Sequence, residues 1–153
     1  MSRQPRAAAP RLPQVLGSCL CGSIKYRIDG PLADFTYCHC SICRKSHGTA
    51  FRARALIRTA DFHLLSGKEL ITYYESTPDT RRGFCRRCGS PILTRFGRNP
   101  AYLGLPLGAL DTDPAIRPAK HVHVTSKAAW FSITDDLPQF PEGPVRKPPG
   151  RGN

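Results

Sequence analysis

The chain has 153 residues, which is typical of one domain with room for a hydrophobic core. With 40% hydrophobic and 22% charged residues, its composition is that of a globular protein. It contains no run of about 18 apolar residues that would predict a membrane-spanning helix, and its first residues lack the apolar segment of a secretory signal. We therefore expect a cytoplasmic protein with no membrane partner. The 15 prolines and 13 glycines favour short strands joined by turns over a helical bundle.

The net charge of +12 comes from 23 Lys and Arg against 11 Asp and Glu. Part of this excess lies in residues 1–14 and 142–153, which contain few apolar residues. We predict that both are disordered basic tails around one folded domain at 15–141. Basic arms of this kind can bind nucleic acid, so a nucleic-acid-binding module is one alternative to an enzyme. The basic residues concerned are Arg3, Arg6, Arg11, Arg146, Lys147 and Arg151.

Seven cysteines stand in three groups with the spacings C-x-C, C-H-C-x-x-C and C-x-x-C-G. An odd number cannot form a complete set of intramolecular disulfides, and disulfides are rare in a reducing compartment. Clustered thiols at these spacings are typical metal ligands, and zinc prefers four thiolates in a tetrahedron. The candidate zinc ligands are Cys19, Cys21, Cys38, Cys40, Cys43, Cys85 and Cys88.

The ligand count favours one division of the seven thiols between two metals. The first and last pairs together complete a closed site of four cysteines, which is the structural type. The middle group supplies three ligands within six residues and leaves a fourth position open, which is the catalytic type. From spacing alone, however, Cys40 and Cys43 could instead join Cys85 and Cys88.

Short alternating segments predict an all-β domain, taken here from the N-terminus. In residues 23–28 the apolar side chains Ile24, Tyr26 and Ile28 share one face of a strand. Residues 35–40 form a strand that leads to a metal loop, and 41–48 form a loop or one helical turn. In 51–58 apolar residues alternate with arginines, which we expect to face solvent. Those arginines are Arg52, Arg54 and Arg58.

The second half of the chain continues this pattern. Residues 62–65 and 70–74 flank Ser66-Gly67, which predicts a hairpin. Further strands are expected at 81–85, 91–96, 101–105, 121–125 and 129–133. A β domain this irregular needs a cross-link to stabilise it. A metal that joins residue 19 to residue 88 would provide one by closing a long loop.

Three motifs resemble the glutathione-dependent formaldehyde-activating enzyme family, which also contains centromere protein V. They are GSCLCG at 17–22, CHCSICRK at 38–45 with Gly48 after it, and FCRRCGSPIL at 84–93. The resemblance extends over roughly residues 16–140. It implies a β-tent fold of short antiparallel sheets with two zinc ions. It also implies a structural zinc at Cys19, Cys21, Cys85 and Cys88, and a catalytic zinc at Cys38, Cys40 and Cys43.

The reaction that this resemblance implies joins formaldehyde to the thiol of glutathione and gives S-(hydroxymethyl)glutathione. In reverse it is a carbon–sulfur lyase reaction. We expect the three-cysteine zinc to capture the thiol, because a coordinating thiol is deprotonated outright. A small thiol and a small aldehyde are then the partners. A redox or metal sensor is a further alternative, since thiolates at an open zinc site are oxidisable.

Other candidate residues surround the second cysteine group. Arg44 and Lys45 are predicted to bind the two carboxylates of glutathione. His39 lies between two ligands on the opposite strand face and is not expected to bind their zinc, whereas His47 is a candidate proton shuttle or fourth ligand. The alternating pair His121 and His123 is expected to lie on a half-buried polar strand face rather than at a metal. These histidine residues are His39, His47, His121 and His123.

Overall fold

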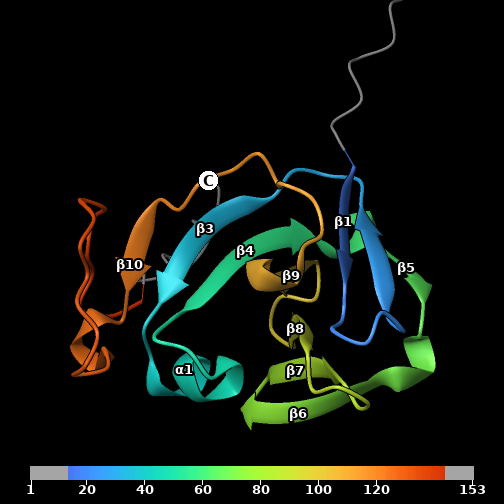
Figure 1. The fold of residues 1–153 in the computed structure, drawn as a ribbon, viewed down its shortest axis with the longest axis horizontal. Coiled ribbons are helices and arrows are strands. Elements are labelled where there is room, and N and C mark those ends of the chain that lie inside the picture. The colour runs from blue at the N-terminus through green and yellow to red at the C-terminus, as the bar shows by residue number, and fades with distance from the viewer. Residues whose placement is uncertain (1–13, 144–153) are drawn as a thin grey trace, which may run out of the picture.

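The computed structural model describes residues 14–143, which form two β-sheets and one α-helix (Figure 1). Residues 1–13 and 144–153 lie outside the described residues, and with them the predicted tail residues Arg3, Arg6, Arg11, Arg146, Lys147 and Arg151. Strands dominate this part of the chain and the only α-helix in it has seven residues, which confirms the all-β prediction. No helix within 14–143 is both long enough and apolar enough to cross a lipid bilayer.

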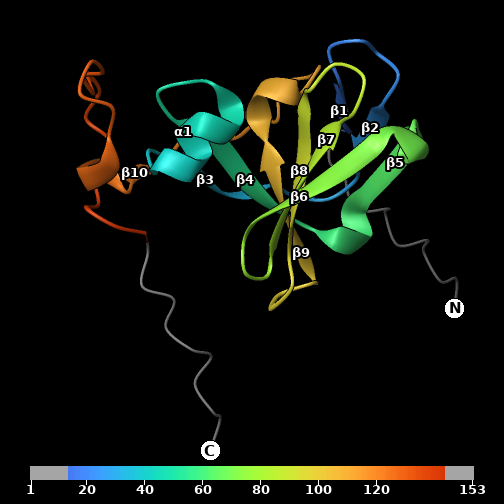
Figure 2. The same ribbon diagram turned by 90° about the horizontal axis from the view of Figure 1, so that it is seen from below.

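The smaller sheet has three antiparallel strands in the order β1-β2-β5. The larger sheet has seven strands in the order β10-β3-β4-β9-β8-β7-β6, antiparallel except where β10 runs parallel to β3. Figure 2 shows the two sheets from below, with α1 beside β4. The strands are β1 (Val15–Ser18), β2 (Lys25–Ile28), β3 (Ala33–Cys38), β4 (Arg52–Arg58), β5 (Phe62–Ser66), β6 (Ile71–Thr77), β7 (Thr80–Cys85), β8 (Pro91–Phe96), β9 (Tyr102–Pro106) and β10 (Lys120–Val122).

Short helices complete the described chain. The helix α1 (Ser41–His47) follows the first ligands of the second cysteine group and ends at Gly48, whose φ of 61° is left-handed. The 3-10 helices are η1 (Thr59–Asp61), η2 (Lys68–Leu70), η3 (Leu107–Ala109) and η4 (Val124–Ser126).

The main core lies between the two sheets. Ile24, Tyr26 and Ile28 are fully buried there, as their alternation predicted, and they belong to the same cluster as Ile57 and Leu105 of the large sheet. Burying large apolar side chains of this kind stabilises the fold by about 1.5–3 kcal/mol each relative to exposure. The small sheet therefore packs on the large one through the face that carries Tyr26 and Ile28.

The predicted hairpin around Ser66-Gly67 is wrong, because β5 and β6 belong to different sheets. The chain crosses between the sheets at Gly67, which has a φ of 76°. A Cβ atom there would lie 2.5 Å from the carbonyl oxygen of Ser23, so the crossing requires glycine. A turn signal in sequence marks where a strand ends but does not say which sheet the next strand joins.

The C-terminal part of the domain also differs from expectation. Residues 129–133 form no strand, and β10 stops at Val122. The later segment instead runs beside β10, where His121 donates its backbone N–H to Pro138 and accepts from Phe140. An isolated parallel bridge pairs His121 with Gln139. This segment therefore covers the edge of the large sheet next to the second cysteine group.

Candidate metal centres and their cavity

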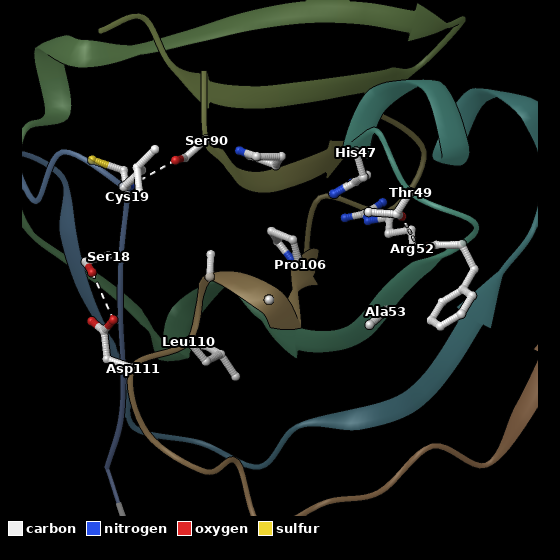
Figure 3. A pocket seen from close by; sticks show the side chains of 15 residues that line it. Ser18, Cys19, His47, Thr49, Arg52, Ala53, Ser90, Pro106, Leu110 and Asp111 are labelled. Carbon is white, nitrogen blue, oxygen red and sulfur yellow. Dashed lines mark hydrogen bonds between the residues drawn. The ribbon is translucent and has the colours of Figure 1, made fainter. Parts of the chain in front are cut away.

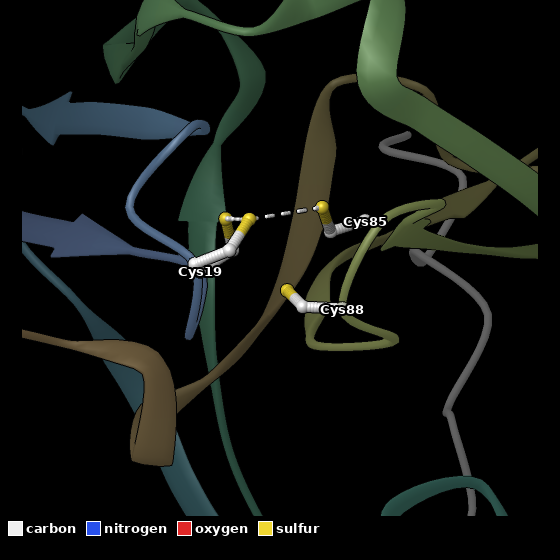
Figure 4. A group of neighbouring side chains, drawn as sticks. Cys19, Cys85 and Cys88 are labelled. Carbon is white, nitrogen blue, oxygen red and sulfur yellow. Dashed lines mark hydrogen bonds between the residues drawn. The ribbon is translucent and has the colours of Figure 1, made fainter.

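Four cysteines meet where the turn after β1 approaches the turn between β7 and β8 (Figure 4). All four Sγ atoms lie within 4.8 Å of one another. The Sγ–Sγ distances are 3.4 Å from Cys19 to Cys21 and 3.9 Å from Cys21 to Cys85. The spacing C-x-C does not lie on a strand, because Leu20 and Cys21 form a tight turn beyond β1. This turn brings both sulfurs to the same point.

Hydrogen bonds favour the thiolate at some sulfurs of this four-cysteine cluster, whereas burial raises the pKa of the Cys85 thiol to about 11. The backbone N–H of Ile24 donates to Cys19 Sγ at 3.3 Å. Ser90 Oγ lies 3.3 Å from Cys88 Sγ, and hydrogen bonding from Ser90 lowers the pKa of the Cys88 thiol to about 5. A set of four sulfurs at these distances, some of them held by donors, fits a tetrahedral metal ion.

The other three cysteines meet at the junction between β3 and α1. Cys38 ends β3, Cys40 is the N-cap of α1, and Cys43 lies in the first turn of the helix. The backbone N–H of Cys43 donates to Cys40 Sγ at 3.3 Å. The three Sγ atoms lie within 4.8 Å of one another, and no fourth His, Cys, Asp or Glu in residues 14–143 joins them. The sulfurs are thus grouped as four and three, which excludes the alternative pairing of Cys40 and Cys43 with the last cysteine pair.

A cavity of about 280 Å³ opens beside the three-cysteine cluster, and three arginines line it. The predicted exposure of Arg52 and Arg54 is wrong, since Arg52 is only 4% exposed and Arg54 is half-buried. Both residues belong to β4, which is flanked by β3 and β9, and both side chains line the cavity instead of facing open solvent. Arg58 is exposed as predicted. The lining residues are Cys38, Cys40, Cys43, Arg52, Arg54, Thr80, Arg82, Thr94, Phe96, Val122, His123 and Gly143.

The third arginine, Arg82, comes from β7 on the far side of the cavity and contacts the cluster directly. Its Nη2 lies 3.7 Å from Cys43 Sγ, and its Nε donates to Ser76 Oγ at 3.0 Å. Hydrogen bonds from the Cys38 and Cys40 thiols are the main cause that lowers the pKa of Cys43, and the charges of Arg52 and Arg82 lower it further. Sequence analysis missed Arg82, because no local pattern distinguishes it from its neighbour Arg81.

His39 and His121 form a buried pair behind the cluster, and sequence analysis missed this relationship as well. His39 Nε2 lies 2.8 Å from His121 Nδ1, and His121 Nε2 lies 3.1 Å from both carboxylate oxygens of Asp135. Both rings are almost fully buried, so the prediction of a half-buried polar face is wrong for His121. His39 is not part of the three-sulfur group, as predicted. His123 instead lines the cavity.

The remaining predicted residues lie around α1. Arg44 donates its Nε to the His39 carbonyl at 3.2 Å, Lys45 is exposed, and neither lines the 280 Å³ cavity. His47 borders a larger cavity of about 660 Å³ together with Arg52 (Figure 3). Burial, followed by the charge of Arg52, lowers the pKa of His47 to about 4. This larger cavity contains only one of the seven cysteines, Cys19, so its size does not make it the centre of thiol chemistry.

A small β protein that gathers its seven cysteines into a set of four and a set of three has the side chains of a thiolate metalloprotein. A family model described as glutathione-dependent formaldehyde-activating enzyme matches residues 14–126. The chain belongs to this family of enzymes, as the motif resemblance implied.

Individual relatives agree with the family assignment. The chain is 34% identical over 125 residues to a Halomonas elongata protein named "Putative glutathione-dependent formaldehyde-activating enzyme", with 76% of this chain and 79% of that protein covered. It is 27% identical over 94 residues to an uncharacterized lyase of Schizosaccharomyces pombe, with 60% and 66% covered. A crystal structure of a Rhodobacter sphaeroides protein superimposes with a TM-score of 0.52 at 29% identity, over 67% of this chain and 91% of that one.

Proposed function

We propose that this chain is a zinc-dependent carbon–sulfur lyase that forms or cleaves a thiol–aldehyde adduct such as S-(hydroxymethyl)glutathione. The observation that carries the proposal is the three-cysteine cluster, which has no fourth side-chain ligand in residues 14–143 and borders a cavity. Membership of the formaldehyde-activating family supplies the class of reaction.

The two cysteine clusters fit zinc in different ways. The set of four completes a closed tetrahedral donor set and would act as a staple between the β1 turn and the β7–β8 turn. The set of three would leave one coordination position for an exogenous ligand. Zinc bound there would supply stabilisation of the anionic form of a substrate thiol.

The chain's own residues would then hold and orient the substrates. Cys38, Cys40 and Cys43 lie at the β3–α1 junction and line the cavity, so the open position would face the cavity. In the forward direction the thiol sulfur forms a bond to the aldehyde carbon, the carbonyl electron pair moves to oxygen, and that oxygen takes the proton lost by the thiol. His123 lines the same cavity and is our candidate for handling this proton.

The predicted carboxylate-binding roles of Arg44 and Lys45 remain predictions. Lys45 is exposed, and Arg44 is held by the His39 carbonyl, so a bound glutathione would have to extend beyond the cavity to meet either. A tripeptide is long enough to do so, because an extended residue spans about 3.3–3.6 Å.

The test is a turnover measurement with glutathione and ¹³C-formaldehyde at equilibrium with their adduct. Exchange NMR gives the rate at which labelled carbon leaves the adduct, and the spontaneous rate is the baseline. We expect zinc-loaded protein to accelerate this exchange and the Cys43→Ser variant to lose the acceleration. Zinc-loaded wild-type protein that leaves the exchange rate at its spontaneous value would reject the proposal for this thiol.

A further inference from the structure

Two of the three cavity arginines have no carboxylate partner among residues 14–143. Arg54 Nη2 pairs with Asp34 at 3.0 Å, and that carboxylate also accepts from Lys120. Arg52 and Arg82 form no ion pair with Asp or Glu within these residues. Each also has a buried nitrogen without a hydrogen-bond partner, Nε of Arg52 and Nη1 of Arg82.

Burying a guanidinium without a counter-charge is costly, because the charge loses its hydration. Arg52 is 4% exposed, and its Nη2 donates at 2.9 Å to a neutral hydroxyl, Thr94 Oγ1. Arg82 likewise binds the neutral hydroxyl of Ser76. Both arginines share a cavity with the three-cysteine cluster, whose thiolates would carry negative charge, and Arg82 Nη2 lies 3.7 Å from Cys43 Sγ.

The charge of a metal at this cluster depends on its fourth ligand. A divalent zinc with three thiolates carries one net negative charge, and a thiolate in the fourth position raises this to two. A neutral fourth ligand such as water or imidazole leaves it at one. The two guanidinium groups without a carboxylate partner carry a charge of plus two, which balances the net charge of the site with four thiolates. With a neutral fourth ligand the site carries only one negative charge, and the two arginines would exceed it.

We propose that Arg52 and Arg82 are specificity-determining residues that make the three-cysteine site select an anionic thiolate over a neutral fourth ligand. This inference rests on the proposed function, since it concerns the ligand at the same site. In this inference the two arginines balance the negative charge of the metal site and do not bind the carboxylates of the substrate. Any thiol is then favoured, with or without carboxylate groups.

The chain offers a matched control on β7. Arg81 is the neighbour of Arg82 on the same strand, is exposed, and projects to the other face, where its guanidinium lies over the Tyr73 ring at 5.1 Å. The variants Arg82→Gln and Arg81→Gln therefore remove the same charge from adjacent positions. Arg82→Lys keeps the positive charge but replaces the planar guanidinium group, with its several N–H donors, by an ammonium group.

The experiment uses the full chain loaded with Co²⁺ in place of zinc, because thiolate-to-cobalt charge-transfer absorption reports thiolate binding without any turnover. Each protein is titrated with 2-mercaptoethanol, which carries no carboxylate, and separately with imidazole at the same pH. We expect Arg82→Gln to weaken thiol binding by about 10-fold or more, since a charge this close to a buried site is little screened. Imidazole binding should change by less than about 3-fold.

The variants separate the possible explanations. Arg81→Gln should bind both ligands as the wild type does, and Arg82→Lys should recover most of the thiol affinity. An equal loss of thiol and imidazole affinity in Arg82→Gln would mean that Arg82 has a structural role. An unchanged thiol affinity would mean that Arg82 has no role in ligand selection. Either result overturns the inference about the arginines and leaves the proposed function standing. Wild-type protein that binds no thiol at all would overturn the proposed function and this inference together.

Discussion

His39 Nε2 lies 2.8 Å from His121 Nδ1, although 82 positions separate the two residues in sequence. The parallel pairing of β10 with β3 brings them together, because it sets Val122 opposite Cys38. The Asp135 carboxylate accepts a hydrogen bond from His121 Nε2–H, and His121 Nδ1 and His39 Nε2 share the single proton of the bond between them. Burial and the neighbouring His121 lower the pKa of His39 to about 4, in keeping with a neutral ring. The pair therefore ties the cysteine loop to the C-terminal segment.

The substitution His121→Ala should lower the free energy of unfolding by about 2–3 kcal/mol, because it leaves the buried His39 Nε2 without its hydrogen-bond partner. Asp135→Asn is the matched control, and it should cost less than about 1 kcal/mol because Asp135 is partly exposed and an amide oxygen can still accept. Urea denaturation of the metal-loaded proteins measures both. Equal losses in the two variants would contradict a buried role for the His39–His121 contact.

The two cysteine clusters should respond differently to the loss of one sulfur. Cys88→Ser should unfold the chain or lower its melting temperature sharply, because the four-cysteine cluster links residues that are far apart in sequence. Cys43→Ser should lose the second metal and keep the fold, with a change in unfolding free energy of about 1 kcal/mol. Circular dichroism melts and metal analysis on both variants check this. A Cys43→Ser protein that fails to fold would show that the second cluster is structural.

His47 should give the protein a pH-dependent stability. Its folded pKa of about 4 lies below the ordinary value of about 6.5, so between these values the unfolded chain binds a proton that the folded chain does not. This contribution is complete above pH 6.5 and is lost as the pH falls towards 4, by up to about 1.4 kcal/mol per pH unit. His47→Gln should remove it. The difference between the unfolding free energies of the two proteins should then vary over this pH range; a constant difference would refute the assignment.

Gly67 and Gly48 provide a matched pair for the crossing between sheets. Both have positive φ, but a Cβ at Gly67 would meet the Ser23 carbonyl oxygen at 2.5 Å, whereas a Cβ at Gly48 meets nothing within 4 Å. Gly48→Ala should cost about 1 kcal/mol from backbone strain alone. Gly67→Ala should cost about 1–3 kcal/mol more, because backbone must move. Chemical denaturation of both variants measures the difference, and equal costs would place the close contact in doubt.

The sequence predicted the parts of this molecule that depend on local spacing. The alternation of Ile24, Tyr26 and Ile28 identified the core face of β2, and the ligand counts indicated the division into four and three sulfurs. The alternation depends on residues two positions apart, where backbone periodicity fixes which side chains share a face. The ligand count depends only on the number of cysteines in each local group, although the set of four joins two groups that are far apart in sequence.

The errors concern contacts between distant segments. Alternation showed that Arg52 and Arg54 share a face of β4, but not that Arg82 of β7 would lie across a cavity from them. His121 was predicted to lie on a half-buried polar strand face because its partner His39 follows a strand that pairs in parallel with β10, a relationship with no short-range signal. The hairpin at Gly67 failed for the same reason, since sheet membership is decided by packing.

The most direct test of the account is the zinc content of the full chain, measured before and after addition of glutathione. We expect two zinc ions per chain, one held tightly and one more labile whose binding changes when glutathione is added, and only the tight one in Cys43→Ser. A wild-type chain that holds a single tightly bound zinc, indifferent to thiols, would contradict an open three-cysteine site and the thiol capture proposed for it.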